Sequence, residues 1–173
     1  MMRLSTSRGF TLIEMLITIA IVAILAMMAA PSFNGFFDKF RVKRAAETVS
    51  AFLINAKSEA VKRNRTVNAV FTGSGATWCA GVTEAATCNC TTAGACQIDG
   101  VDRVVRSTSF KGVELDGLTS PHEFNFEPLL RNVDNDTVEL ESAEGLKINV
   151  VVSRFGRIRL CSPGSSVGGY PAC

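Results

Sequence analysis

The chain has 173 residues and a formal net charge of +2 at pH 7, with 47% hydrophobic and 20% charged residues. This length fits one globular domain plus one membrane helix and excludes a large multidomain protein. The near-neutral charge excludes polyanion binding through net charge alone, so a local cluster would have to provide it. One such cluster exists, because residues 147–173 contain four basic residues and no acidic one.

The first long apolar stretch covers residues 10–30 and contains one charged residue, Glu14. Since about 20 mainly apolar residues span a bilayer, the stretch predicts a transmembrane helix. A carboxylate inside such a segment indicates a functional site, and a free amine is its natural partner. A cut between Gly9 and Phe10 would place a new N-terminus one helical turn from Glu14. A secretory signal peptide with residues 1–8 as its basic region is the alternative; the length of the stretch and the position of Glu14 count against it.

The sequence Gly9-Phe10-Thr11-Leu12-Ile13-Glu14 resembles the processing site of type IV pilins and of type II secretion pseudopilins. The resemblance implies that residues 1–9 are a leader, that a prepilin peptidase cleaves after Gly9, and that Phe10 is N-methylated. It also implies that the helix waits in the inner membrane, with a periplasmic domain, and later packs with other pilins in a filament. There Glu14 would pair with the amine of Phe10 in a neighbouring subunit, because a charge in an apolar bundle is tolerated only when paired.

Residues 31–65 are expected to form the amphipathic half of the same helix, because apolar residues recur there at spacings of three and four. This apolar stripe consists of Val42, Ala45, Ala46, Val49, Phe52, Leu53, Ala56 and Ala60. The stripe should pack against the globular domain, and Asn64 should end the helix.

Residues 66–161 contain short runs of strand-forming residues separated by turns, which predicts an antiparallel sheet or sandwich. The expected strands are residues 66–71, 76–79, 101–109, 113–115, 124–126, 137–141, 147–153 and 157–161. The run Val150–Val152 favours a strand buried on both faces. We expect Trp78 in the core and His122 in a loop, without a catalytic role. The expected fold class is therefore α+β, with a long N-terminal helix packed on an antiparallel β-rich domain.

All six cysteines follow the membrane segment, and an even number in an exported domain predicts disulfides. They are Cys79, Cys88, Cys90, Cys96, Cys161 and Cys173. Six cysteines allow fifteen pairings, among which Cys161–Cys173 would close the tail of residues 162–173 into a loop. Zinc is the competing interpretation, but Cys88 and Cys90 lack the usual ligand spacing and His122 is the only histidine. We expect no metal and no cofactor.

The sequence Gly156-Arg157-Ile158-Arg159 is the candidate DNA site. Residues two apart in a strand share a face, so Arg157 and Arg159 should project together, about 7 Å apart, while Ile158 faces the core. Guanidinium groups bind phosphate oxygens in pairs, and Gly156 would allow a close backbone approach. Arg154 would add a contact, and such phosphate contacts do not read base sequence. The alternative is an ordinary solvated edge strand, whose arginines prevent pairing with a neighbouring sheet.

The long N-terminal helix, followed by strands that end in the sequence of residues 151–159, resembles the minor pilins of the FimT class and the related GspH pseudopilins. The G-R-x-R pattern is associated with the DNA-uptake members of the FimT class. The resemblance therefore implies a minor pilin of a type IV pilus that binds double-stranded DNA weakly, for uptake in natural transformation.

Two alternatives to this function stay open. One is a type II secretion pseudopilin that takes part in protein export, and the other is a priming or tip minor pilin without DNA binding. We expect no enzyme, because the sequence has no Walker loop, metal pair or G-x-S-x-G motif.

Overall fold

The computed structural model describes residues 9–129, 133–165 and 167–173, and for residues 28–34 and 165 it describes the backbone alone. The chain divides into two compact units, Met1–Phe37 and Asp38–Cys173. Helix α1 (Leu12–Arg63) contributes to both units, and every strand of the described chain lies in the second. The expected α+β class is confirmed.

Helix α1 begins with a threonine N-cap, which is one half of a capping box. Its first residue, Leu12, follows Thr11, whose Oγ1 accepts a hydrogen bond from the backbone N–H of Glu14 at 3.3 Å. A threonine followed three residues later by glutamate is the sequence pattern of this cap. The described side chains from Phe10 to Met27 are all exposed. Over the described residues, no helix combines the length and the apolar content that crossing a bilayer requires.

The second unit contains the amphipathic end of α1, which stops at Arg63 as expected. Asn64 takes a left-handed backbone (φ 52°), and the N–H of Arg65 then donates to the carbonyl of Ala60 at 3.3 Å. Asparagine tolerates this conformation better than most residues, which is why it ends helices in this way. The eight residues of the predicted apolar stripe are all buried.

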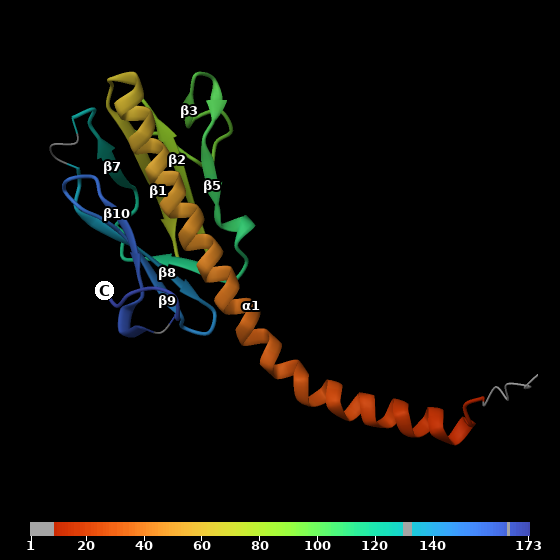
Figure 1. The fold of residues 1–173 in the computed structure, drawn as a ribbon. Helices are drawn as coiled ribbons and strands as arrows, with labels where there is room; N and C mark the ends of the chain where they lie inside the picture. Colours follow the sequence, from red (N-terminus) through yellow and green to blue (C-terminus); the bar gives the residue numbers. More distant parts are fainter. Residues whose placement is uncertain (1–8, 130–132, 166) are drawn as a thin grey trace, which may run out of the picture. The chain divides into compact units, whose positions relative to one another are not determined.

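Two four-stranded antiparallel sheets form the rest of the unit (Figure 1). The first has the order β5-β2-β1-β7 and consists of β5 (Val104–Arg106), β2 (Thr77–Thr83), β1 (Val67–Ser74) and β7 (His122–Phe126). The second has the order β10-β9-β8-β6 and consists of β10 (Ile158–Cys161), β9 (Lys147–Val152), β8 (Asp136–Ser142) and β6 (Val113–Asp116). The sheets meet where Gly75 and Leu115 exchange two backbone hydrogen bonds, at 2.8 and 2.9 Å.

The shorter elements connect these sheets. A two-stranded hairpin consists of β3 (Gln97–Ile98), where no strand was expected, and β4 (Val101–Asp102), at the start of the strand expected over residues 101–109. Its Asp99-Gly100 turn has φ of 53° and 73°, which is the usual sequence and geometry of a tight hairpin. The 3₁₀ turns are η1 (Ser107–Ser109) and η2 (Pro163–Ser165).

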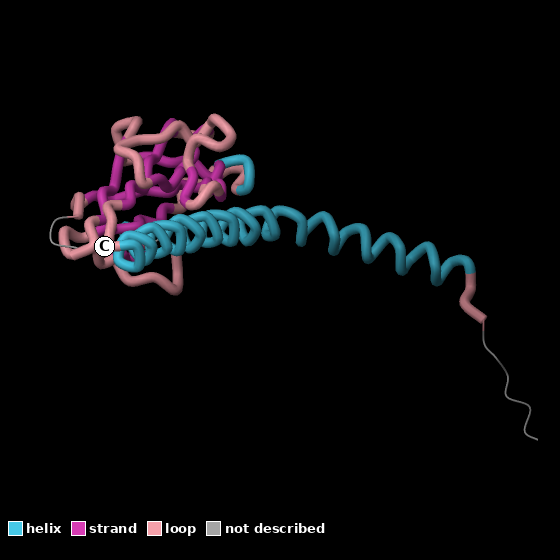
Figure 2. The backbone as a smooth tube through the Cα atoms, turned by 90° about the horizontal axis from the view of Figure 1, so that it is seen from above, coloured by secondary structure: helices cyan, strands magenta, loops and turns pink. Residues whose placement is uncertain are grey.

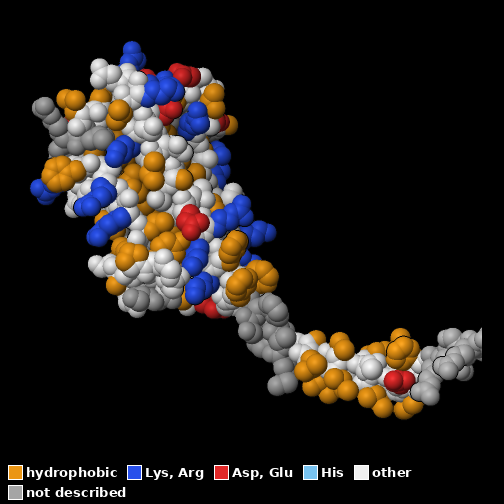
Figure 3. Space-filling view, viewed as in Figure 1, with side chains coloured by type: hydrophobic (Ala, Val, Ile, Leu, Met, Phe, Trp, Pro, Cys, Tyr) orange, Lys and Arg blue, Asp and Glu red, His pale blue; other side chains and the backbone are white. Residues whose placement is uncertain are grey.

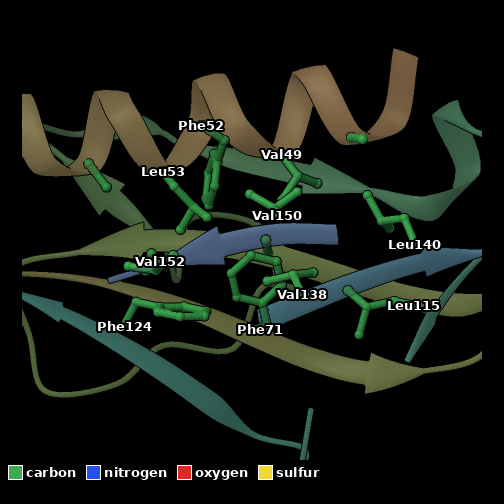
Figure 4. Packing of buried hydrophobic residues seen from close by; sticks show 14 of the residues in the cluster. Val49, Phe52, Leu53, Phe71, Leu115, Phe124, Val138, Leu140, Val150 and Val152 are labelled. Carbon is green, nitrogen blue, oxygen red and sulfur yellow. The ribbon is translucent and has the colours of Figure 1, made fainter. Parts of the chain in front are cut away.

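The core lies between the buried stripe of α1 and both sheets. Figure 2 shows this part of the helix running along one side of the strands, and Figure 4 shows Val49, Phe52 and Leu53 pointing from it toward the sheets. They meet side chains from both sheets: Phe71, Leu115, Phe124, Val138, Leu140, Val150 and Val152. Every residue of this described core belongs to the unit Asp38–Cys173, so the hydrophobic contacts of the fold are complete without the first 37 residues.

Three sequence-based expectations are wrong. The single strand expected over residues 101–109 is divided into β4, β5 and the 3₁₀ turn η1. His122 begins strand β7 rather than lying in a loop; its ring packs against Phe124 at 4.8 Å between centroids, and its Nε2 lies 3.4 Å from an Asp136 carboxylate oxygen. The run Val150–Val152 is not buried on both faces, because burial alternates along β9 and Val151 stays partly exposed. Trp78 is buried in the core, as expected, and donates from Nε1 to the carbonyl of Val113 at 3.2 Å.

Candidate functional site

The predicted processing site lies on exposed chain before the first turn of α1. Gly9 and Phe10 are both exposed, and the Phe10 side chain is 83% accessible. A Cβ added at Gly9 would meet no atom within 4 Å, so the fold of the described chain does not itself require glycine there. An enzyme that cuts after Gly9 would therefore find an open backbone. Residues 1–8 of the expected leader lie outside the described residues.

Glu14 lies one helical turn beyond this site, and its side chain is exposed. Its backbone N–H is satisfied by Thr11, so the residue already has a local role in starting the helix. No cation of the described chain forms an ion pair with its carboxylate. The expected pairing with an amine would have to come from a second subunit.

The candidate DNA site forms the turn between β9 and β10. The N–H of Ser153 donates to the carbonyl of Arg157 at 2.9 Å, and the N–H of Gly156 donates to the carbonyl of Ser153 at 2.7 Å. Ser153 Oγ also accepts from the N–H of Arg157 at 3.1 Å. Gly156 is buried with φ of 66°, a left-handed conformation that glycine adopts without strain. These bonds close a tight turn with Arg154 and Phe155 at its tip.

Two details of the expected site are wrong. Gly156 is buried and its N–H and carbonyl are both bonded within the fold, so it does not offer the open backbone expected for a close approach of DNA. Strand β10 starts at Ile158, so Arg157 belongs to the turn and not to the strand. The side-to-side alternation predicted for Arg157 and Arg159 therefore applies only from Ile158 onward. Arg159 still pairs with Val151 of β9 in the strand register, and its side chain is exposed.

The arginines of this turn and of the start of β10 are exposed and form no ion pair in the described chain. They are Arg154, Arg157 and Arg159, and no Asp or Glu follows Glu144 in the sequence. Figure 3 shows basic side chains gathered over the edge of this unit that carries β10, with hydrophobic side chains among them. This region can therefore attract phosphate groups, because no ion pair of the described chain neutralises its arginines.

A groove separates this turn from α1. Its volume is about 460 Å³, and it is lined by Ile54, Lys57, Ser58, Val61, Gly156, Arg157 and Ile158. Lys57 crosses the groove and donates from Nζ to the carbonyl of Gly156 at 2.9 Å. Sequence reasoning missed both Lys57 and the exposed Phe155. Only Phe155 left a sequence signal, as a large aromatic residue directly between Arg154 and Gly156-Arg157.

The six cysteines form three disulfides: Cys79–Cys90, Cys88–Cys96 and Cys161–Cys173. Their Cα–Cα distances of 5.9, 5.3 and 5.0 Å are usual for such bonds. The first two lie in one buried cluster with Val70, and the third closes the C-terminal tail directly after β10. Where described, the chain contains no cluster of His, Cys, Asp or Glu arranged for a metal ion.

The closed tail is docked on α1 through Tyr170. Its hydroxyl donates to Glu47 Oε1 at 2.7 Å, and Lys43 lies over its ring, 5.3 Å from the centroid. Lys43 Nζ also donates to the carbonyl of Gly168 at 2.8 Å. Burial, and next the hydrogen bond to Glu47, raise the pKa of Tyr170 to about 12.

A second anchor joins the end of α1 to the cysteine-rich loop, which is the segment of residues 84–103 between β2 and β5 and carries Cys88, Cys90 and Cys96. The Arg63 guanidinium contacts Asp99 in the β3–β4 turn through both terminal nitrogens, with Nη1 to Oδ1 at 2.8 Å. It also contacts Glu59 at 2.7 Å and Glu84 at 3.2 Å. The hydrogen bonds from Arg63 hold the pKa of Asp99 and of Glu59 below their ordinary values.

Comparison with known proteins gives two family matches. Residues 4–30 match the family described as a prokaryotic N-terminal methylation motif, and residues 45–156 match the family described as type II transport protein GspH. Two fimbrial proteins of Pseudomonas aeruginosa are each 40% identical over 55 residues, which is 32% of this chain. The chain matches only about a third of their length, 36% in each case.

Two crystal structures of the type IV minor pilin FimU from Pseudomonas aeruginosa have a similar fold. In space group P65 the TM-score is 0.52 with 17% identity over 72% of this chain, and in P21 it is 0.55 with 18% identity over 76%. Each comparison covers 98% of the FimU chain, and at this identity it shows the fold alone. The resemblance to the FimT/GspH class is thereby confirmed. Because the GspH match covers more than half of the chain, this protein belongs to the GspH family, and its methylation motif makes it a pilin-like member of that family.

Proposed function

We propose that this protein is a minor pilin of a type IV pilus that binds double-stranded DNA without sequence preference, in the uptake step of natural transformation. The observation that carries the proposal is the β9–β10 turn, which presents Arg154, Arg157 and Arg159 without an acidic partner in the described chain. Arginine forks bind phosphate oxygens in pairs, and buried Gly156 gives the turn its shape. The role is structural and binding, without catalysis.

The proposed life cycle follows from the N-terminal motif. A prepilin peptidase cleaves after Gly9 and methylates Phe10, while residues 10–30 anchor the chain in the inner membrane with the β-rich domain in the periplasm. The protein then joins major and minor pilins in the filament, where Glu14 pairs with the Phe10 amine of a neighbour. The three disulfides support this compartment, because such bonds persist in the oxidising periplasm.

The DNA affinity of one subunit should be weak. Only two to four phosphates can be engaged by this turn, so log K should fall against log salt with a slope of about −2 to −4. Several subunits, or partner pilins, would then have to add avidity.

The test is binding of a fluorescent DNA duplex to the purified full chain in a non-ionic detergent, followed by anisotropy. The double variant Arg157→Gln/Arg159→Gln should bind more weakly and with a salt slope smaller by about 2. The matched control is Arg41→Gln/Lys111→Gln, which also removes two exposed charges. Arg41 lies roughly 24 Å from Lys57 along the helix axis, so this control should bind like the unaltered protein.

A second function, a type II secretion pseudopilin that takes part in protein export, is favoured by the GspH family match. It requires no DNA binding by the turn, and neither does a priming or tip subunit. If the unaltered chain does not bind DNA at low salt, or if the two double variants bind equally, the DNA-binding proposal fails and these functions replace it.

A further inference from the structure

Phe155 is a large apolar side chain at the tip of the basic turn, and 73% of its surface is exposed. It belongs to none of the hydrophobic clusters of the described chain, so the fold does not need it there. In the sequence it lies between Arg154 and Gly156-Arg157, so the same short turn carries this ring and two exposed arginines. An aromatic ring within a basic surface is the usual composition of a site for unpaired bases, in which rings stack on bases and arginines contact phosphates.

The backbone that carries the ring is braced by hydrogen bonds on both sides of Phe155. The residues on either side of the tip, Ser153 and Gly156, are joined by a backbone hydrogen bond of 2.7 Å, and Lys57 fixes the Gly156 carbonyl to α1. The carbonyl of Arg154 also accepts from the N–H of Val133 at 3.1 Å. Because the backbone is braced in this way, little backbone freedom is lost when a ligand binds at the tip, which favours binding.

We propose that Phe155 is a stacking platform for an unpaired base, so that the β9–β10 turn binds single-stranded DNA more tightly than duplex DNA. This inference rests on the DNA binding proposed above. In a duplex the faces of the bases are covered by their neighbours, so the ring can stack only where a strand is unpaired. The apolar side chains of Ile54 and Val61, each about half exposed, line the adjoining groove and extend the surface that a base can cover.

Electrostatics alone predicts the opposite preference. Each phosphate contact releases more counterions from duplex DNA than from a single strand. The slope of log K against log salt is about −0.9 per contact for the duplex and about −0.7 for the single strand. A site made only of arginines would therefore favour the duplex. A preference for the single strand requires a contribution that does not depend on charge, and Phe155 is the candidate side chain beside these arginines.

The test compares two fluorescent probes with the same number of phosphates, an oligothymidine and a blunt duplex, on the full chain in a non-ionic detergent. The unaltered protein should bind the single strand at least about five-fold more tightly, the lower end of the effect of one stacked base. Phe155→Ala should abolish or reverse this preference without weakening duplex binding or changing the salt slope. Phe155→Tyr should keep the preference, whereas Phe155→Leu, which preserves apolar area but not the flat ring, should lose it.

Each other outcome overturns the inference. If the unaltered protein binds both probes with equal affinity, no stacking contribution is needed. If Phe155→Leu keeps the preference for the single strand, the preference comes from apolar area and not from a flat ring. If the Arg157→Gln/Arg159→Gln variant loses both probes while Phe155→Ala changes neither, DNA binding stands and the stacking role falls. If no probe binds at low salt, the proposed function itself fails, and Phe155 would then be a contact for another pilin.

Discussion

Lys57 on helix α1 donates a hydrogen bond from its Nζ to the carbonyl oxygen of Gly156, over 2.9 Å, and so ties the helix to the β9–β10 turn. The two residues are 99 positions apart in the sequence. The Lys57 side chain therefore has a structural role, because its ammonium group provides the hydrogen bond that the carbonyl of the buried residue Gly156 needs. The shape of the basic turn depends on the helix as well as on its own residues.

Replacing Lys57 with Met should loosen this turn without unfolding the domain. Met keeps the apolar stem but removes the donor, and a hydrogen bond to a charged group is worth about 1.5–3 kcal/mol. Amide hydrogen exchange at Gly156 should therefore accelerate roughly ten- to a hundred-fold. Lys62→Met is the control, since Lys62 is exposed on the same helix. Unchanged exchange at Gly156 in Lys57→Met would show that the turn holds its shape alone.

Gly81 in β2 should not tolerate a side chain. A Cβ built there would lie 2.3 Å from Cys96 Sγ and 2.6 Å from Cys96 Cβ, inside the buried disulfide cluster. We expect Gly81→Ala to lower the free energy of unfolding by about 1–3 kcal/mol, the usual cost of overpacking. Denaturant unfolding under oxidising conditions measures the effect.

The control for Gly81 is Gly168→Ala. A Cβ at Gly168 meets only the mobile end of Lys39, at 3.8 Å, so the change in unfolding free energy should stay within about 0.5 kcal/mol. Peptide mapping of both variants should give the three disulfides of the structure. Equal stability of the two variants would contradict the packing of Gly81 against Cys96.

The parts of the fold that the sequence predicted correctly are those set by local pattern. The buried stripe of α1 follows from a 3.6-residue period, and the helix ends at Asn64 because that residue tolerates a left-handed backbone. Periodicity failed at Val150–Val152, since a run of valines looks the same whether one face or both are buried. It also failed at Arg157, because the turn bonds to Ser153 delay the start of β10 by one residue.

The contacts that the sequence could not predict join residues far apart in the chain. The Arg63–Asp99 and Lys57–Gly156 contacts exist only after the sheets have positioned their loops against α1. The pairs Cys79–Cys90 and Cys88–Cys96 are close in sequence, with separations of 11 and 8, but they are interleaved, so the sequence alone could not choose between them and the other pairings of these four cysteines. By contrast, the Cys161–Cys173 bond needs only a tail of twelve residues to fold back, so sequence could suggest it.

Removing the Arg63 guanidinium should weaken the anchor between α1 and the cysteine-rich loop in a pH-dependent manner. The pKa of Asp99 lies below its ordinary value of 3.8 because Arg63 hydrogen-bonds its carboxylate. The stabilisation from this pair is therefore present above that ordinary value, and it is lost as the pH falls through the lowered pKa. Arg63→Gln should be less stable than the unaltered protein at neutral pH.

Denaturant midpoints of both proteins across the acidic range provide the measurement for Arg63. The difference between them should shrink as Asp99 and Glu59 become protonated. Arg65→Gln is the matched control, because Arg65 is 73% exposed and makes a single longer contact of 3.5 Å with Glu84. A difference for Arg63→Gln that stays constant with pH would argue against the ion pair and for packing by the arginine stem.

Tyr170 offers a direct view of the docked tail, because it is the only tyrosine of the chain. Folding raises its pKa to about 12, so the unfolded state, with a pKa of about 10, loses its phenolic proton first as the pH rises. The stabilisation from neutral Tyr170 is complete below pH 10 and is lost as the pH rises toward about 12.

Ultraviolet titration of the tyrosinate should give this raised pKa. Glu47→Gln should lower it while leaving it above 10, since burial is the larger cause. The same pKa in both proteins would show that Glu47 does not hold the tail.

The last prediction concerns Glu14 and the assembly of the filament. The backbone N–H of Glu14 is bonded by the Thr11 N-cap of α1, and its exposed carboxylate has no cationic partner in the described chain. Glu14→Gln preserves the capping pattern but removes the charge. If the charge pairs with the Phe10 amine of a neighbour, this variant should still be cleaved after Gly9, because that site is exposed and separate, yet should join filaments poorly.

Two measurements on the same cells separate these steps. Mass spectrometry of the membrane fraction should find N-methylated Phe10 in the unaltered protein, and a cleaved N-terminus beginning at Phe10 in Glu14→Gln. Co-purification with sheared pili should recover the unaltered protein and much less of the variant, because a charge buried without its partner is strongly destabilising. Thr11→Val is the control: it removes the hydroxyl of the N-cap and keeps the carboxylate, so it should assemble nearly normally. Equal loss in Thr11→Val and Glu14→Gln would assign the defect to helix initiation, and recovery of Glu14→Gln at the level of the unaltered protein would exclude the pairing altogether.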